Sequence, residues 1–245
     1  MVMKYARIAL VSIVWNLSMS ITFEVRNGSP TSEMSTCAIA ETVGHARRRF
    51  KLNQFRKGEI AQFIWFDTGG AATGWAHIAV HTRAFSHPRL ELLPHVVAWN
   101  TGEYRDTETA MAHSCINRVL WARWGPPSHA TVFPEMLIVG TEDFDRQPNQ
   151  RGGKEVLSPV RINAMIDYGL FVVCKGVKLQ YQGRSMRTQV TVDRLFRWGF
   201  EPPKGYRWGT SGKGKDSFAA MQHVITAMRR VKQEADKRPW KLETA

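Results

Sequence analysis

The fold of this chain is decided by residues 63–80, which read FIWFDTGGAATGWAHIAV. The first four residues are apolar without alternation, which is typical of a central strand covered on both faces. Gly69 and Gly70 favour a tight turn, after which a second strand follows. Asp67 is therefore expected at the end of a buried strand, where the sheet meets solvent. A carboxylate there is well placed to hold a cation, and a plain turn is the alternative interpretation.

Length, charge and cysteine spacing restrict the class of protein. The 245 residues suffice for one large domain or two small ones, and the 43% of hydrophobic residues exclude a mostly disordered chain. The formal net charge of +13 attracts polyanions, so nucleic acid is the first candidate partner and an anionic membrane surface the second. Cys37, Cys115 and Cys174 form no CxxC pair, which argues against a zinc ribbon and favours reduced thiols.

The N-terminal part of the chain indicates no membrane-spanning segment. The apolar run at residues 8–15 is too short to span a bilayer, and no small-residue cleavage site follows it promptly. We therefore expect a cytoplasmic protein. Its expected organisation is an N-terminal extension over residues 1–61, poorly ordered or peripheral, a compact domain over residues 62–235 and a C-terminal tail over residues 236–245.

The rest of the chain alternates apolar runs with segments of helical spacing. Beyond the first strand pair, strands are expected at residues 90–97, 136–139 and 170–174. Helices are expected at residues 106–124, 158–169, 192–199 and 217–232. This alternation predicts an α/β fold with helices packed on a mixed sheet.

Three carboxylates fall at the ends of these elements: Asp67 after the first strand, Glu142 after the apolar run at residues 136–139, and Asp216 before the last helix. Oxygen ligands of this kind suit Mg²⁺ or Mn²⁺. Two such ions about 3.5–4 Å apart stabilise both the attacking and the leaving oxygen in phosphodiester cleavage. Each acid also has a structural interpretation, and that of Asp216 is a helix N-cap.

At these residues the sequence resembles the RuvC-like Holliday junction resolvases, especially the divergent bacteriophage forms, within the RNase H-like superfamily. The resemblance extends over about residues 62–232. It is carried by DTG at 67–69 with TGWA at 73–76, by Glu142 closing an apolar strand, by GRSMRTQV at 183–190, and by Lys215-Asp216 opening an apolar helix.

The resemblance implies an RNase H-like mixed five-stranded sheet flanked by helices, and a metal-dependent endonuclease that acts on Holliday junctions or other branched DNA as a homodimer. It implies that Asp67, Glu142 and Asp216 are catalytic and hold two Mg²⁺ or Mn²⁺ ions. Asp143 and His223 are candidate assisting residues. The expected DNA contacts are Arg184, Arg187, Lys213 and Lys215.

The chain departs from the family pattern in two places. Thr68 stands where the family commonly has proline, and Lys213 and Ala219 stand where it tends to have a further acid or histidine near the last aspartate. The fourth ligand is therefore open. His223 lies two helical turns beyond Asp216 and could assist, although structural packing is the alternative for a single histidine in an apolar helix.

Two other functions stay open at the level of sequence. An actin-like phosphotransferase uses a similar strand turn, but it requires a second Asp-Gly phosphate turn, which the second half of this chain lacks. A DNA-binding protein without catalysis also fits the positive charge. It predicts that Asp67→Asn leaves all function intact.

Overall fold

The structure is a computed structural model of the whole chain, which separates into two units, Met1–Met34 and Ser35–Ala245. All residues described below belong to the second unit. They are residues 39–40, 47–48, 59–85, 92–124, 136–144, 154–174, 176–183 and 189–237. Among the described helices, none has both the length and the apolar character that crossing a bilayer requires.

The centre of the fold is a five-stranded sheet with the order β5-β4-β3-β6-β7. Its strands are β3 (Ile60–Thr68), β4 (Thr73–His81), β5 (Val96–Tyr104), β6 (Leu137–Asp143) and β7 (Leu179–Gly183). The pairs β3–β4 and β4–β5 are antiparallel, whereas β3–β6 and β6–β7 are parallel. The predicted α/β class, with a mixed five-stranded sheet flanked by helices, is confirmed. A separate antiparallel pair joins β1 (Ile39–Ala40) to β2 (Arg47–Arg48).

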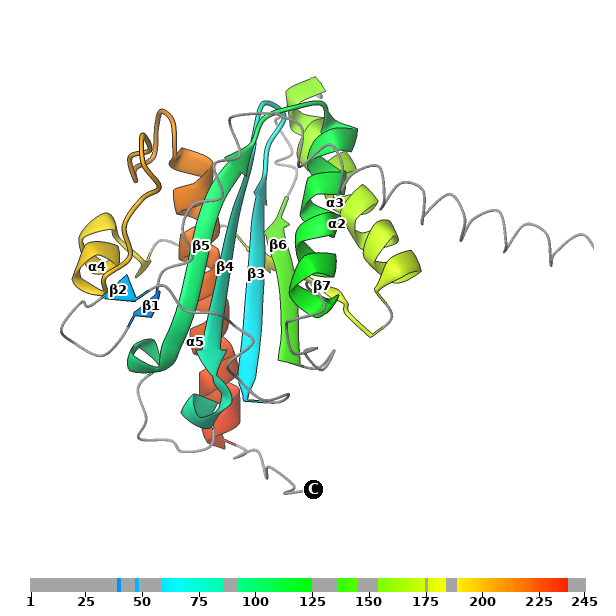
Figure 1. Cartoon of the computed structure of the whole chain (residues 1–245). Helices are drawn as coiled ribbons and strands as arrows, with labels where there is room; N and C mark the ends of the chain where they lie inside the picture. The colour runs from blue at the N-terminus through cyan, green and yellow to red at the C-terminus, as the bar shows by residue number, and fades with distance from the viewer. Residues whose placement is uncertain are drawn as a thin grey trace, which may run out of the picture. The chain divides into compact units, whose positions relative to one another are not determined.

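Helices cover both faces of the sheet (Figure 1). The long helix α5 (Lys215–Lys237) packs on β3, β4 and β5, while α2 (Glu108–Trp124) and α3 (Lys154–Val173) pack together on the other face. The short α4 (Val192–Arg197) and the 3₁₀ turns η2 (Thr82–Phe85) and η3 (Leu93–His95) complete the described elements. Each face of β3 has its own core, because Phe63 and Trp65 pack towards α5 while Ile64 and Phe66 pack towards α2 and α3. This explains why the strand is apolar without alternation.

Two of the strands expected from the sequence are placed differently in the structure. Residues 170–174 were predicted as a strand, but they continue and end α3, and β7 lies at Leu179–Gly183 instead. The physical reason is helical periodicity, since Ile162, Ile166 and Leu170 form one buried stripe. The strand expected at residues 90–97 begins only at Val96, because η3 precedes it.

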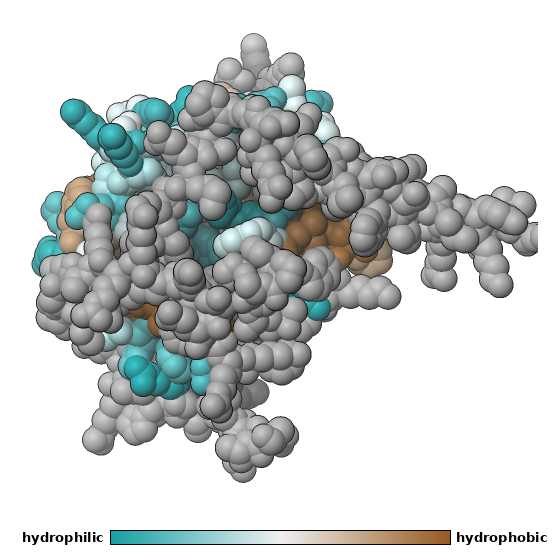
Figure 2. Space-filling view, viewed as in Figure 1, coloured by the Kyte–Doolittle hydropathy of each residue, from teal (hydrophilic) through white to brown (hydrophobic). Residues whose placement is uncertain are grey.

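The outward side of α3 is apolar. Leu157, Val160, Tyr168 and Phe171 are between 37% and 79% exposed, and Ala164 lies exposed among them. Figure 2 shows a brown, apolar area on the side of the molecule where Figure 1 places α2 and α3. Exposed apolar side chains that follow one helix stripe indicate a contact surface.

The first turn of α5 lies directly on β4 at Gly74. A Cβ atom added to Gly74 would overlap the main-chain carbonyl group of Asp216. The hydroxyl group of Thr101 on β5 also donates to the carbonyl oxygen of Trp75 on β4 at 2.7 Å and lies 3.4 Å from the carbonyl oxygen of Ser217, and so links β4 and β5 to α5. The absence of a side chain at residue 74 therefore sets how closely α5 approaches the sheet.

We predict that Gly74→Ala lowers the free energy of unfolding by about 2 kcal/mol, because α5 must shift to make room for the methyl group. Urea unfolding followed by circular dichroism measures the change. The matched control is Gly183→Ala on β7, where an added Cβ meets no atom of the described residues within 4 Å. Equal midpoints for the two variants would contradict this account of the contact.

Candidate metal centre

Strand register places two carboxylates side by side. Asp67 near the end of β3 and Glu142 near the end of β6 come one residue beyond the paired residues Phe66 and Thr141. Because β3 and β6 are parallel neighbours, residues at matching positions point to the same face of the sheet, here the face covered by α5. Two acids far apart in the sequence therefore become neighbours.

His223 of α5 completes a cluster of three potential ligands. One ligand atom from each of Asp67, Glu142 and His223 lies within 4.8 Å of the other two, and these are the residues of the described part that form such a group. The Nε2 atom of His223 lies 3.0 Å from Oε2 of Glu142. The imidazole is fully buried, whereas both carboxylates are half-buried. The cluster is thus closed on the helix side and accessible at the end of the sheet.

Trp65 fixes the imidazole ring from the sheet side. Its indole lies two residues before Asp67 on the same face of β3 and stacks on His223, with ring centroids 6.5 Å apart and an interplanar angle of 16°. Gly140 on β6 leaves the space for this indole, because an added Cβ would overlap the ring. His223, which the sequence indicated as a candidate assisting residue, is therefore held beside both carboxylates.

Asn163 of α3 ties the ends of β3 and β6 together from the opposite face. Its Oδ1 accepts hydrogen bonds from the hydroxyl groups of Thr68, at 2.9 Å, and Thr141, at 2.8 Å. Its Nδ2 donates to the main-chain carbonyl oxygen of Glu142 at 3.2 Å. These contacts hold the segments that carry the two acids, since a buried amide with several partners restrains the strands it joins.

Asp216 lies near this cluster but is not one of its three members. It occupies the first turn of α5, over Gly74, which is the register partner of Asp67. Its Oδ1 lies 3.8 Å from Nζ of Lys215. The assignment of Asp216 as a third metal ligand stays a prediction, and the structure adds His223 beside the first two.

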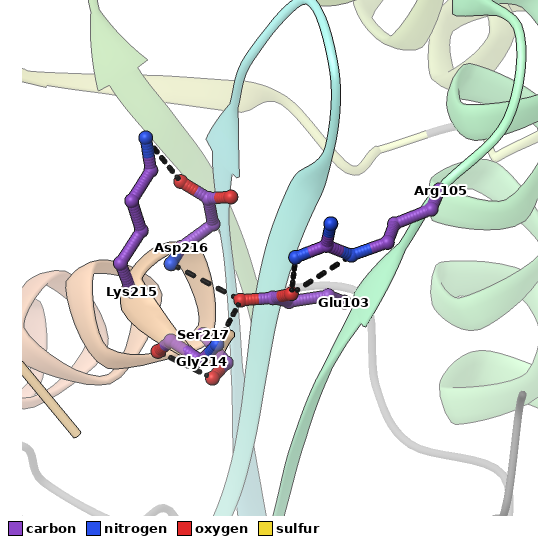
Figure 3. A network of polar contacts seen from close by, with 6 residues as sticks. All are labelled: Glu103, Arg105, Gly214, Lys215, Asp216 and Ser217. Atoms are coloured by element: carbon purple, nitrogen blue, oxygen red, sulfur yellow. Dashed lines mark hydrogen bonds and ion pairs between the residues drawn. The ribbon is translucent and has the colours of Figure 1, made fainter. Parts of the chain in front are cut away.

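A buried carboxylate on β5 anchors the start of α5. Oε1 of Glu103 accepts from the backbone N–H groups of Gly214, at 2.8 Å, and Asp216, at 3.3 Å, while Oε2 accepts from Arg105 at 2.7 Å (Figure 3). The hydrogen bond with Glu103 raises the pKa of Arg105 above its ordinary value. The carboxylate therefore compensates the orphan donors of the helix end and its positive dipole. In Figure 3 the Asp216 carboxylate points towards Lys215, away from Glu103.

The remaining predicted residues fall in different places. Asp143 is exposed and lines a cavity of about 650 Å³ between α3 and β7, on the face opposite the cluster. Lys213 is exposed, with its Nζ 4.6 Å from the ring centroid of Tyr206. Arg184 and Arg187 lie outside the described residues.

Sequence reasoning missed Glu103 and Asn163. The signal for Glu103 was present, because Trp99, Thr101 and Glu103 alternate on the buried face of β5. Asn163 follows the buried Ile162 on α3, but an asparagine within a helix has no distinct sequence signature. The function of Asn163 follows only from its contacts with the ends of β3 and β6, which the sequence does not indicate.

The donor set of the cluster fits a divalent cation. Two carboxylates with one imidazole suit Mn²⁺, and carboxylates with solvent-accessible space suit Mg²⁺, which retains several waters. An ion would also offset the repulsion between Asp67 and Glu142. Cys115 and Cys174, by contrast, are free and buried away from this cluster among the apolar residues beneath α2 and α3, and Cys37 lies outside the described residues.

No model of a known protein family matches this sequence, and neither does any curated protein. Two solved structures of Thermus thermophilus RuvC are similar to the chain. One gives a TM-score of 0.43 and 11% sequence identity, over 71% of this chain and 97% of that one. The second, RuvC in complex with a Holliday junction substrate, gives a TM-score of 0.43 and 10% identity over the same shares. The similarity is one of backbone structure and not of sequence.

We predict that Glu103→Gln lowers the free energy of unfolding by about 2 kcal/mol, because the charge-assisted bonds to Arg105 and to the start of α5 are weakened. Urea unfolding at low salt measures the loss. The control is Glu234→Gln, which removes an exposed ion pair with Lys237, worth only a few tenths of a kcal/mol. A loss no larger for Glu103→Gln than for the control would refute the anchoring function.

Proposed function

We propose that this protein is a metal-dependent, structure-selective endodeoxyribonuclease that resolves Holliday junctions or cuts other branched DNA. The observation that carries the proposal is the convergence of Asp67, Glu142 and His223 at one end of a mixed sheet. The sequence motifs that resemble RuvC-like resolvases, and the net charge of +13, support the same function. A phage origin and a cytoplasmic location are part of the proposal.

The proposed roles follow from the chemistry of each side chain. Asp67 and Glu142 would hold the first ion with His223, and Asp216 would complete the site for a second. Bound Mg²⁺ or Mn²⁺ would lower the pKa of a water for attack at neutral pH and would stabilise charge on the phosphate oxygens. Trp65 and the start of α5 keep these ligands oriented and close the site on one side. Oriented ligands need no rearrangement during the reaction, which favours the transition state.

Cations near the site would bind the DNA backbone. Lys213 and Lys215 are exposed beside the start of α5, where phosphates could approach the cluster, and Arg184 and Arg187 are proposed to add contacts. Phosphate contacts of this kind position the nucleic acid without reading its sequence. Tyr206 next to Lys213 would stack on an unpaired base at a branch point.

The proposed assembly is a homodimer that buries the outward side of α3. The exposed residues Leu157, Val160, Ala164, Tyr168 and Phe171 follow one another at steps of three, four, four and three, the spacing of a helix–helix seam. A second copy is the occupant that we propose, because the sizes of the residues are symmetric about the centre of the stripe: the small Ala164 lies in the middle, with larger side chains on both sides.

Charge supports the same register. In an antiparallel pair of α3 helices centred on Ala164, Arg161 faces Asp167 of the partner subunit, and both are exposed beside the stripe. Leu157 then faces the partner's Phe171. Opposite charges beside an apolar seam are the arrangement that fixes orientation in helix pairs.

We predict that the protein makes paired nicks in synthetic four-way junctions when Mg²⁺ is present, and that Asp67→Asn lowers the single-turnover rate at least ~1000-fold, about 4 kcal/mol of transition-state stabilisation. Junction binding should persist in this variant. Denaturing gels measure cleavage, and mobility shifts measure binding.

The control for this experiment is Asp193→Asn, the same chemical change at an exposed residue of α4. Undiminished cutting by Asp67→Asn would refute the proposed site. Binding without cutting by the unmodified protein would instead favour a DNA-binding protein without catalysis.

For the dimer, we predict that Phe171→Glu weakens self-association more than ~30-fold, since a buried aromatic anchor is worth about 2 kcal/mol or more. Sedimentation equilibrium measures it. Phe196→Glu, at an exposed aromatic on α4, is the control. Arg161→Asp should also weaken the dimer, and adding Asp167→Arg should restore it. A monomeric unmodified protein at tens of micromolar, or dissociation by the control alone, would rule out the α3 interface.

A further inference from the structure

Gln182 of β7 lies in the same row of the sheet as the metal centre. It is the register partner of Glu142, which in turn lies beside Asp67. Because β6 and β7 are parallel, the side chains of Gln182 and Glu142 point to the same face and stand one strand spacing apart, roughly 4.8 Å. The row therefore reads, from β3 to β7, carboxylate, carboxylate, amide.

The side-chain amide of Gln182 is buried without a hydrogen-bond partner in the described part of the protein. The residue is 2% exposed, and among the described residues neither Nε2 nor Oε1 has a hydrogen-bond partner. A buried amide without partners costs free energy on folding, about 1–3 kcal/mol. Buried polar groups that stay unpaired in a native protein often mark a functional site or a place for an ion or water.

Metal binding changes the partners of Glu142 in a way that gives this amide a function. His223 contacts Glu142 through Nε2, at 3.0 Å. A histidine that ligates a metal through Nε2 presents a lone pair there, so it can no longer donate a hydrogen bond from that atom. Glu142 thus loses this donor when His223 becomes a ligand, and a ligating carboxylate is normally oriented by a donor from the protein.

We propose that Gln182 is that donor: a positioning residue whose Nε2 donates to the carboxylate of Glu142 when Glu142 and His223 hold a divalent ion. The inference rests on the metal centre of the proposed function and deepens it. The proposal explains why the Gln182 amide has no partner without metal: it lies next to Glu142, to which it would donate once the ion is bound.

The test is the affinity of the full-length protein for Mn²⁺, measured by isothermal titration calorimetry without DNA. Gln182→Leu should weaken Mn²⁺ binding about 10–100-fold, the usual effect of removing a group that orients a ligand. Its melting temperature without metal should stay equal or rise, because the variant no longer buries an unpaired amide. If leucine is not tolerated, Gln182→Met supplies the same comparison with an unbranched side chain of similar volume.

Gln180→Leu is the matched control, since Gln180 lies two residues earlier on the same strand and face but is exposed. A second comparison uses Glu142→Gln. In that background Gln182→Leu should cause little further loss, because the positioning residue acts through the carboxylate. Unchanged Mn²⁺ affinity of Gln182→Leu beside a binding unmodified protein would overturn this inference. Absence of Mn²⁺ binding by the unmodified protein would overturn the proposed metal centre itself.

Discussion

The structure depends on one electrostatic constraint: two carboxylates must stand next to each other on neighbouring strands. Asp67 and Glu142 repel one another, and the pairing of β3 with β6 keeps them neighbours, because strand register fixes their main chains side by side. Neighbouring cations or hydrogen-bond donors offset such a pair. The fold supplies His223 from α5 and leaves the end of the sheet accessible, which is the condition for an external cation to bind.

Both faces of the sheet serve this constraint in different ways. On the α3 face, Asn163 links the ends of β3 and β6 through hydrogen bonds between neutral groups, which do not involve the two carboxylates. On the α5 face, Glu103 anchors the first turn of the helix that carries His223. Here a third carboxylate is used structurally, and it is kept apart from the cluster by Gly74 and the start of α5.

How much the sequence could predict differs between the elements. Asp67 and Glu142 could be placed near one another because both end apolar strands, and parallel strands bring their ends together. His223 could be named as a candidate from its place two helical turns beyond Asp216. That it lies beside both carboxylates could not be predicted, since this depends on how closely α5 packs on the sheet at Gly74, a long-range contact. The strand expected at residues 170–174 was wrong because a short apolar run fits a helix and a strand equally well, and there tertiary packing on α2 decided for the helix.

The two sides of α3 connect the proposed dimer to the proposed site. Asn163 faces inward and holds the strand ends, while the next residue, Ala164, faces outward at the centre of the apolar stripe. A contact centred on Ala164 therefore bears on the helix turn that positions both carboxylates. Pairing through α3 would restrain that turn in each subunit, because packed helices resist small displacements. In the proposed enzyme, assembly and ligand geometry thus depend on the same turn of helix.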